Sequence, residues 1–559
     1  MYYGKLYYLS SVQYIGKSTT AEHWTSLCEY AQTVSTFIVT DAAADFEAQI
    51  SLSALYRFAR HQLPLFPSLS HLVIIEADAS IAHLELLVTP SLKSLEVSCI
   101  PDAQQSNFFS FLTAIEEGAL LQTLILGPGR FESRSLQIIS QFNNLRHLEL
   151  KPNEDSEIPS TFFDNIGCLP KLETLILDAR YVSSTMTKNL WQPSSMNASM
   201  VLPAFEDVNS LYADSIPDSN FVDGKSKGGG AGGVLVSQNC HLPISTSGSF
   251  NQLAKLHVIG WLTLFEDLMP RITSTKLEDV SITFIRLSYD ELKVSLAKEQ
   301  AQGRLREEIG TIDWQAEEQR FLKEQEYLRL ASQVSFDSHT VFCTELIRTL
   351  YHRWTISLKA VSICQLDGSF QQLLEPPCLP EEMFRELLLL PAIENLEMNG
   401  WMLDSVDSVI NVVESISNLK SLLLPLDETN SGISLPTLRH VAETCPRLEI
   451  FQTRIEPLYL IPEYDVPTTE ALSHGLRTLS MGNSSLHMDF DDLYLIARHL
   501  YLLFPNLTTI NSTFPEYNAE QWSDLDRWMK VFQTARIDDM NRRPVLITND
   551  SQSCHARRI

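Results

Sequence analysis

The chain repeats a short phrase of apolar and polar positions, Leu-x-x-Leu-x-Leu with apolar substitutes, from near residue 69 to near residue 512. The fourth and sixth positions of each phrase are apolar and alternate with polar neighbours, as they do between Leu145 and Leu150. A period of two is typical of a short strand that turns one face towards a core. The phrases begin at Leu69, Leu92, Leu121, Leu145, Leu172, Leu253, Leu277, Leu358, Ile393, Leu419, Leu448, Leu476 and Leu507.

The spacing of the phrases predicts a repeating architecture. Ten of the twelve gaps between them are 23 to 35 residues long, and the other two are both 81. A unit of this size cannot bury its own apolar face, whereas a stack of units buries a continuous core. Most gaps also leave room for a helix after the strand. We therefore predict an α/β leucine-rich-repeat solenoid, a horseshoe with parallel strands on its concave side and helices on its convex side.

Proline supports this choice of repeat boundaries. It cannot continue a helix, and it tolerates the missing N–H at the first residue of a strand. With 26 prolines in 559 residues, chance would place fewer than one at a given position of the thirteen phrases. The alternative interpretation is a set of unrelated amphipathic helices rich in leucine. Proline stands two residues before the phrase in six repeats, at Pro67, Pro90, Pro170, Pro391, Pro446 and Pro505.

The segments outside the phrases divide the chain further. Residues 1–60 contain an amphipathic helical piece from Trp24 to Val39, and we expect this region to cap the first repeat. The two long gaps hold a Ser- and Gly-rich insertion predicted to be disordered and a charged helical insertion. The charged helix either lies solvated on the convex side or binds a partner. The predicted division is a helical cap over 1–60, repeats over 61–182, a disordered insertion over 183–249, repeats over 250–286, a charged helical insertion over 287–335, repeats over 336–515, a C-terminal helical cap over 516–545 and a flexible tail over 546–559.

Composition narrows the classes of partner. A net charge of −27 and a pI near 4.9 disfavour binding to nucleic acid or to an anionic membrane, because both need clustered Lys and Arg. The nine cysteines form no Cys-x-x-Cys pair and are expected to be reduced. The sequence shows neither a signal peptide nor an apolar run of about 18 residues. We expect an intracellular protein, cytoplasmic or nuclear, with no nucleic-acid or membrane partner.

Motif searches give no catalytic chemistry. Neither Gly-x-Ser-x-Gly nor His-Glu-x-x-His occurs in the sequence. The segment Asp223 to Ser226 resembles the end of a phosphate-binding loop, but Ser219 stands where that loop needs its first glycine. We therefore expect no enzymatic activity, no cofactor and no metal.

The predicted site is the concave face of the solenoid. Outward positions on such a sheet vary without disturbing the core, which suits recognition of a large partner. On three neighbouring strands these positions mix both signs of charge, a combination that favours orientation and selectivity. We predict that a protein partner binds there. The predicted partner-binding residues are His147, Glu149, Lys151, Asp178, Lys255 and His257.

Several longer phrases carry a family resemblance. They are Glu382 to Leu396, Gly432 to Arg439, Cys445 to Leu448, Trp24 to Ala31 and Leu503 to Leu507. Together they resemble the large fungal group of F-box proteins with leucine-rich repeats, over about residues 20–540 apart from the two insertions. The resemblance implies an N-terminal F-box that docks on the Skp-type adaptor of an SCF ubiquitin ligase, and repeats that hold the substrate.

The chain departs from that family at its N-terminus. The Leu-Pro-x-Glu opening of an F-box is missing from residues 1–60, and the chain is expected to start just downstream of it. Leu379 to Met383 matches the opening but lies inside the repeat array, where we expect a repeat helix. Two functions follow: the substrate receptor of an SCF-type ligase, which binds an Skp-type adaptor only if an F-box precedes this chain, or an interaction scaffold without a ligase.

Overall fold

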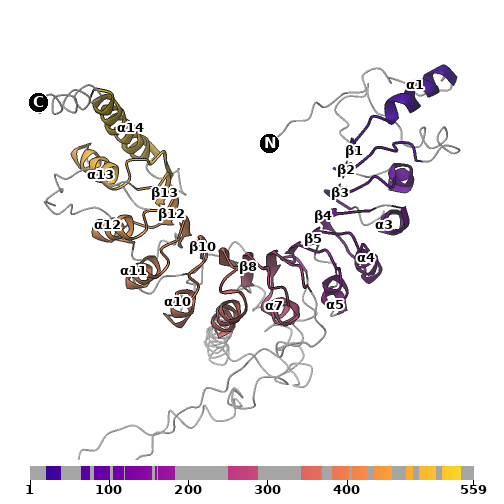
Figure 1. Cartoon of the computed structure of the whole chain (residues 1–559), viewed down its shortest axis with the longest axis horizontal. Helices are drawn as coiled ribbons and strands as arrows, with labels where there is room; N and C mark the ends of the chain where they lie inside the picture. The colour runs from indigo at the N-terminus through magenta and orange to yellow at the C-terminus, as the bar shows by residue number, and fades with distance from the viewer. Residues whose placement is uncertain are drawn as a thin grey trace, which may run out of the picture.

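The protein is a horseshoe in which the strands line the inner, concave side and the helices form the outer, convex side (Figure 1). This computed structural model describes residues 21–39, 64–75, 81–100, 105–118, 120–153, 156, 158–159, 161–182, 250–286, 341–367, 381–401, 406–425, 432–455, 474–481, 490–511 and 519–542. The predicted insertions at 183–249 and 287–335 and the predicted tail at 546–559 lie outside the described residues.

All fourteen strands of the sheet run parallel and lie side by side in chain order. This arrangement confirms the leucine-rich-repeat solenoid, because each repeat contributes one strand and stacks on its two neighbours. The strands are β1 (Thr36–Val39), β2 (His71–Ile74), β3 (Ser94–Val97), β4 (Thr123–Gly129), β5 (His147–Pro152), β6 (Thr174–Asp178), β7 (Lys255–Gly260), β8 (Asp279–Arg286), β9 (Ala360–Asp367), β10 (Asn395–Glu397), β11 (Ser421–Leu423), β12 (Ile450–Thr453), β13 (Thr478–Met481) and β14 (Thr509–Asn511).

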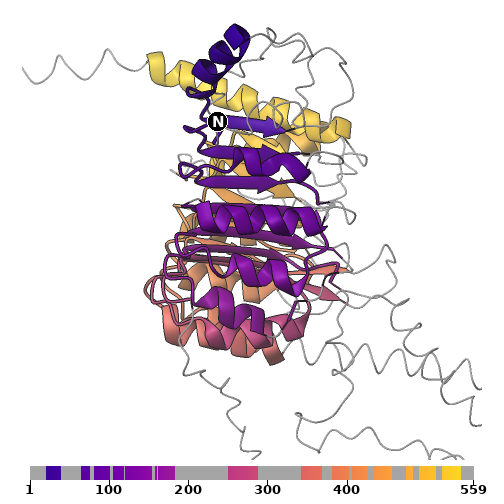
Figure 2. The ribbon, with the colours of Figure 1, turned by 90° about the vertical axis from the view of Figure 1, so that its right-hand side faces the viewer.

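The described helices lie on the convex side, most of them between two successive strands, and Figure 2 shows the repeats stacked layer upon layer. Residues 341–354 are also helical and precede β9. The other helices are α1 (Ala21–Ala31), η1 (Ile81–Leu87), α3 (Gln105–Gly118), α4 (Ser133–Ile139), α5 (Thr161–Gly167), α7 (Leu262–Leu268), η4 (Met269–Arg271), α10 (Glu381–Leu387), α11 (Val406–Ser415), α12 (Leu435–Thr444), α13 (Phe490–Leu503) and α14 (Ala519–Arg542).

The core follows the leucine phrases. All thirteen predicted phrase residues from Leu69 to Leu507 are buried, and none is more than 2% exposed. Leu148, Leu175 and Leu479, which the phrase places at inward strand positions, are each 0% exposed. The predicted phase of the repeats is therefore correct, and one continuous apolar core runs through the solenoid.

The prolines before the phrases sit in a recurring turn. In each of these six repeats the first phrase residue donates its N–H to the carbonyl three residues earlier, as Leu448 does to Cys445 at 3.1 Å. Proline is then the second residue of the turn, a position that its fixed φ suits. Leu419 makes the same bond to Ile416 without a proline, so the turn belongs to the fold and proline only favours it.

The N-terminal region differs from the sequence prediction. A single helix was expected from Trp24 to Val39, whereas α1 ends at Ala31 and β1 follows at Thr36–Val39. β1 pairs in parallel with β2, Phe37 beside Leu72, and so adds one more strand to the sheet. The last part of the predicted helix was therefore wrong: Phe37 and Val39 are partly buried against the core as strand residues.

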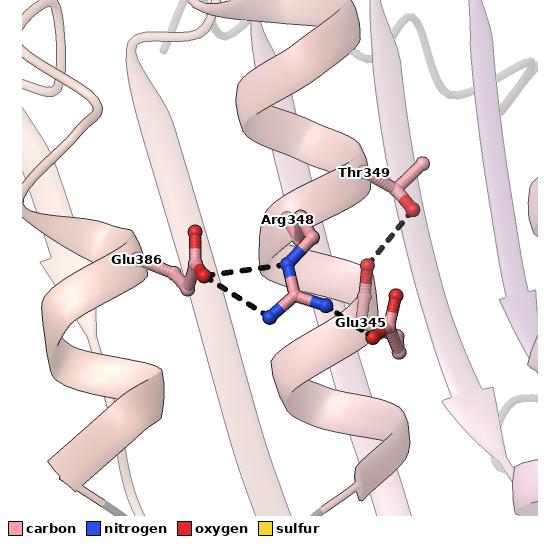
Figure 3. A network of polar contacts seen from close by, with 4 residues as sticks. All are labelled: Glu345, Arg348, Thr349 and Glu386. Carbon is pink, nitrogen blue, oxygen red and sulfur yellow. Dashed lines mark hydrogen bonds and ion pairs between the residues drawn. The ribbon is translucent and has the colours of Figure 1, made fainter. Parts of the chain in front are cut away.

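Polar contacts join two convex helices that follow the second insertion in the chain. Arg348, in the helix at 341–354, donates from Nε and Nη2 to Glu386 of α10 at 3.3 and 3.2 Å and also pairs with Glu345 (Figure 3). The described part of the segment that resembles an F-box opening, Glu381 to Met383, lies in α10, a convex repeat helix, as predicted.

The C-terminal helix α14 covers the last repeat and lies within the range expected to be a helical cap. Leu525 and Met529 are buried in the core, and the ring of Trp528 meets Tyr494 of α13 edge to face at 5.1 Å. Phe532 stacks on Tyr501 of the same helix at 5.6 Å. These large, partly buried rings cover the end of the apolar core.

Candidate functional site

The strand register brings the predicted residues of the concave face into rows. His147 pairs with Thr174, which pairs with Lys255, and Lys255 pairs with Asp279. In the next row Glu149 pairs with Ile176, which pairs with His257. Neighbouring strands lie about 4.8 Å apart, so the predicted side chains from β5 and β7 are about two strand spacings apart.

The β5 residues form one local cluster. Lys151 Nζ lies 2.7 Å from Glu149 Oε1, and His147 Nε2 lies 3.9 Å from Glu149 Oε2. Burial lowers the pKa of His147 below its ordinary value, while Glu149 opposes this shift and Lys255 adds to it. Glu149 is therefore the centre of this cluster, flanked by two basic groups of its own strand.

Asp178 faces a residue that the sequence prediction missed. Arg180 Nε donates to Asp178 Oδ1 at 2.8 Å, and the guanidinium lies 5.8 Å from the ring centre of Tyr181. Arg180 lies just beyond the end of β6, where the alternation of inward and outward positions no longer applies. Asp178 therefore pairs with Arg180, two residues further along the same chain segment, and not with Lys255.

On β7, Lys255 is exposed and His257 is half-buried. His257 Nε2 lies 3.1 Å from Asp279 Oδ2 of β8 but makes no hydrogen bond to it. The contact is therefore an ion pair only when His257 is protonated. Asp279 is the first residue of β8 and was not part of the predicted site.

A second polar cluster, which we call the Glu397 network, lies further along the concave face. Asn399 Nδ2 donates to Glu397 Oε1 at 2.7 Å, and Ser362 Oγ donates to Glu397 Oε2 at 3.0 Å. Gln452 Nε2 donates to Asn399 Oδ1 at 3.1 Å. Ser362 also lies 3.3 Å from the sulfur of Cys364, whose pKa is raised mainly by burial. The network joins residues of β9, β10 and β12.

Backbone geometry supports the Glu397 network. Gly400 has a φ of +78°, and a Cβ there would stand 2.0 Å from the carbonyl oxygen of Gln365. Only glycine tolerates both conditions. Trp401 is buried, and its Nε1 donates to the carbonyl of Ile363 at 3.0 Å. The segment that carries Asn399 is therefore held tightly against β9.

The site offers binding groups on a rigid support. Within the ranges that the structure describes, no cluster of three or more His, Cys, Asp or Glu residues could hold a metal ion. None of the helices in those ranges is both long and apolar enough to cross a membrane. The face presents carboxylates, amides, hydroxyls and cations in fixed positions, the groups that a protein surface uses to recognise another.

Comparisons with known proteins add little to this description. No protein-family model matches the chain, and no curated protein does. Among solved structures, the crystal structure of a TLR13–ssRNA13 complex matches with 12% sequence identity and a TM-score of 0.28. The match covers 88% of this chain and 63% of the TLR13 chain. This chain therefore spans less than two thirds of the length of the TLR13 chain. A likeness of this size carries no functional argument.

Proposed function

We propose that this chain binds a protein partner on its concave face and serves as the substrate receptor of an SCF-type ubiquitin ligase. The observation that carries the proposal is the row of charged and polar side chains across β5 to β8. These side chains point away from the apolar core and are oriented by one another, as Lys151 and Glu149 are at 2.7 Å. Binding rather than catalysis is the role that such a surface suits.

The charge of the chain supports a protein partner over a nucleic acid. The net charge of −27 repels phosphate, and the cations Lys151 and Arg180 are each already paired with a carboxylate. A protein partner can instead offer both signs of charge against the mixed surface.

The ligase part of the proposal rests on the family resemblance. If the protein works as a substrate receptor, an F-box preceding the repeats must dock on an Skp-type adaptor. Co-purification of the full-length protein with an Skp-type adaptor tests this link. Failure to co-purify, with partner binding intact, would favour the scaffold without a ligase.

Partner binding is tested by reversing two charges of the predicted site. The double variant Glu149→Lys with Lys255→Glu keeps the net charge and changes no core residue. We expect it to lose the partners that the wild-type protein captures from a lysate, with an unchanged thermal transition. The Glu149 change should act most strongly, because a lysine there would face Lys151 and His147.

A matched control uses the convex side. Arg439→Glu with Glu443→Lys reverses an exposed ion pair of α12, whose atoms lie 2.8 Å apart, and again keeps the net charge. This variant should capture the same partners as the wild type. Equal capture by the concave and convex variants would contradict binding through β5 to β8.

A further inference from the structure

Four carboxylates of the concave face differ in what they contact. Glu149, Asp178 and Asp279 each face a basic group of the same molecule, at 2.7, 2.8 and 3.1 Å. Glu397 is different, since its described partners, the side chains of Ser362, Asn399 and Cys364, are all neutral donors. Its negative charge is thus oriented by neutral hydrogen bonds and not balanced by any of them.

The network leaves Glu397 able to accept more. A carboxylate has about four acceptor sites over its two oxygens; Ser362 and Asn399 take one on each oxygen, and the Cys364 thiol takes a third. About one site therefore remains. The guanidinium group of arginine is more weakly hydrated than an ammonium group and can donate a charge-assisted hydrogen bond to that site.

The carboxylate is also held in place before any partner arrives. Asn399 is itself fixed by Gln452, whose Nε2 also donates to the carbonyl of Leu424 at 3.4 Å. Gly400 allows the backbone after Asn399 to lie against β9. An anchor with fixed geometry loses little conformational freedom on binding, which favours affinity.

We propose that Glu397 is the anchor point for an arginine side chain of the protein partner. This inference rests on the proposed function, because it names the chemistry of the partner on the same concave face. The net charge of −27 supports it, since a basic segment is attracted to the whole molecule as well as to Glu397.

The test is a selection from a random linear peptide library displayed on phage, with the full-length protein as the immobilised target. Selected peptides should contain arginine, and their binding is then measured by fluorescence anisotropy. Glu397→Gln removes the charge but keeps one acceptor for Asn399 and one polar contact for Ser362. We expect it to weaken binding about tenfold or more.

Two further variants sharpen the result. Glu443→Gln on α12 makes the same change of net charge on the convex side and should leave binding unchanged. Glu397→Arg should bind poorly to the selected peptide and recover binding when the peptide's arginine is replaced by glutamate. Ser362→Ala removes one donor that orients Glu397, and it should weaken binding less than Glu397→Gln does. If Glu397→Gln does not fold, Ser362→Ala provides the test in its place.

The outcomes separate this inference from the proposed function. If the selected peptides lack arginine, or bind Glu397→Gln as well as the wild type, the Glu397 assignment is wrong. If binding then still falls in Glu149→Lys with Lys255→Glu, the concave face remains the binding surface. Peptides that bind both concave variants as tightly as the wild type, or an absence of any selected peptide, would overturn the two proposals together.

Discussion

The same residue type plays different parts according to its position in the repeat, as the histidines show. His147 and His257 lie on the concave face, whereas His474 stands four residues before β13 and is 1% exposed. Its Nδ1 accepts the N–H of Leu476 at 3.0 Å, and its ring packs edge to face on Phe504 at 4.9 Å. Burial lowers the pKa of His474, and the nearby backbone of Cys445 opposes that shift in part. His474 is therefore neutral in the folded protein at pH 7.

This burial predicts a loss of stability in acid. The unfolded chain binds a proton on His474 near pH 6.5, whereas the folded protein resists protonation until a lower pH. The contribution of neutral His474 to the free energy of unfolding is thus fully present above about pH 6.5. It decreases as the pH drops below that value, by at most about 1.4 kcal/mol per pH unit.

The measurement compares unfolding free energies of the wild type and His474→Asn between about pH 7 and pH 5. Asparagine keeps an acceptor for Leu476 but cannot ionise, so its stability should depend less on pH over this range. The absolute stability of the variant is expected to be lower, because the contact with Phe504 is lost. Parallel pH profiles for the two proteins would refute the role of His474.

The candidate site was predictable only where strand alternation holds. All six predicted residues lie on the strands as expected, but the contacts among them depend on side-chain conformation, which the sequence does not reveal. Arg180 follows a strand end, and Ser362 lies on β9, whose outward positions were not recognised. The Glu397 network needs contacts over 35 to 53 positions of sequence, and no local pattern signals these.

At the level of secondary structure, thirteen of the fourteen strands were predictable, because the leucines of each phrase are the residues that the strand buries in the core. β1 was not, because Thr36 to Val39 contains no leucine phrase and is too short to show a clear period of two. Its identity as a strand comes from pairing with β2, a tertiary contact. The helix boundary was missed because Val34 falls at helical spacing after Leu27 and Ala31 and so extends the apolar face of α1 past its end.

The recurring turn predicts a stabilising substitution. Ser417 is exposed and occupies the position that proline holds in six repeats, since Leu419 donates its N–H to the carbonyl of Ile416 at 3.3 Å. Ser417→Pro should raise the free energy of unfolding by about 0.4 to 1 kcal/mol, because proline restricts the unfolded chain and fits the turn. Chemical denaturation of the two proteins measures this difference.

Ile356 also stands two residues before a phrase, the one that begins at Leu358, but there we expect proline not to stabilise the protein. There Leu358 bonds to Trp354, four residues earlier, so the turn is wider than the one at Ser417. Thr355 keeps a helical contact through its Oγ1 to the carbonyl of Tyr351, a conformation disfavoured before proline. Ile356→Pro should therefore give no gain in stability. A gain there, or none for Ser417→Pro, would contradict the turn argument.

At the scale of the whole molecule, the repeats before and after residues 183–249 pack directly on one another. β6 and β7 pair in register although 67 residues, 183–249, separate the described segments on either side. Trp261 Nε1 donates to the carbonyl of Val182 at 3.1 Å, and Phe250 donates its N–H to the carbonyl of Gly167 at 2.7 Å. On the convex side Arg271 Nε donates to Asp164 of α5 at 2.7 Å. Contacts between neighbouring repeats thus join the segments before and after residues 183–249 directly.

These contacts predict that the solenoid does not depend on residues 183–249. Replacing them with a short Gly-Ser linker should leave the melting transition nearly unchanged, because strand pairing, core and ion pair all lie outside the deleted range. Differential scanning calorimetry of the two proteins tests this, and Arg271→Leu in the full-length chain serves as a sensitivity control that should lower the transition. A large loss of stability in the deletion variant would mean that residues 183–249 pack on the repeats. An unchanged melting transition would show that the stacking of the repeats is enough to hold the concave face in its shape. Residues 183–249 could then serve a role other than stability.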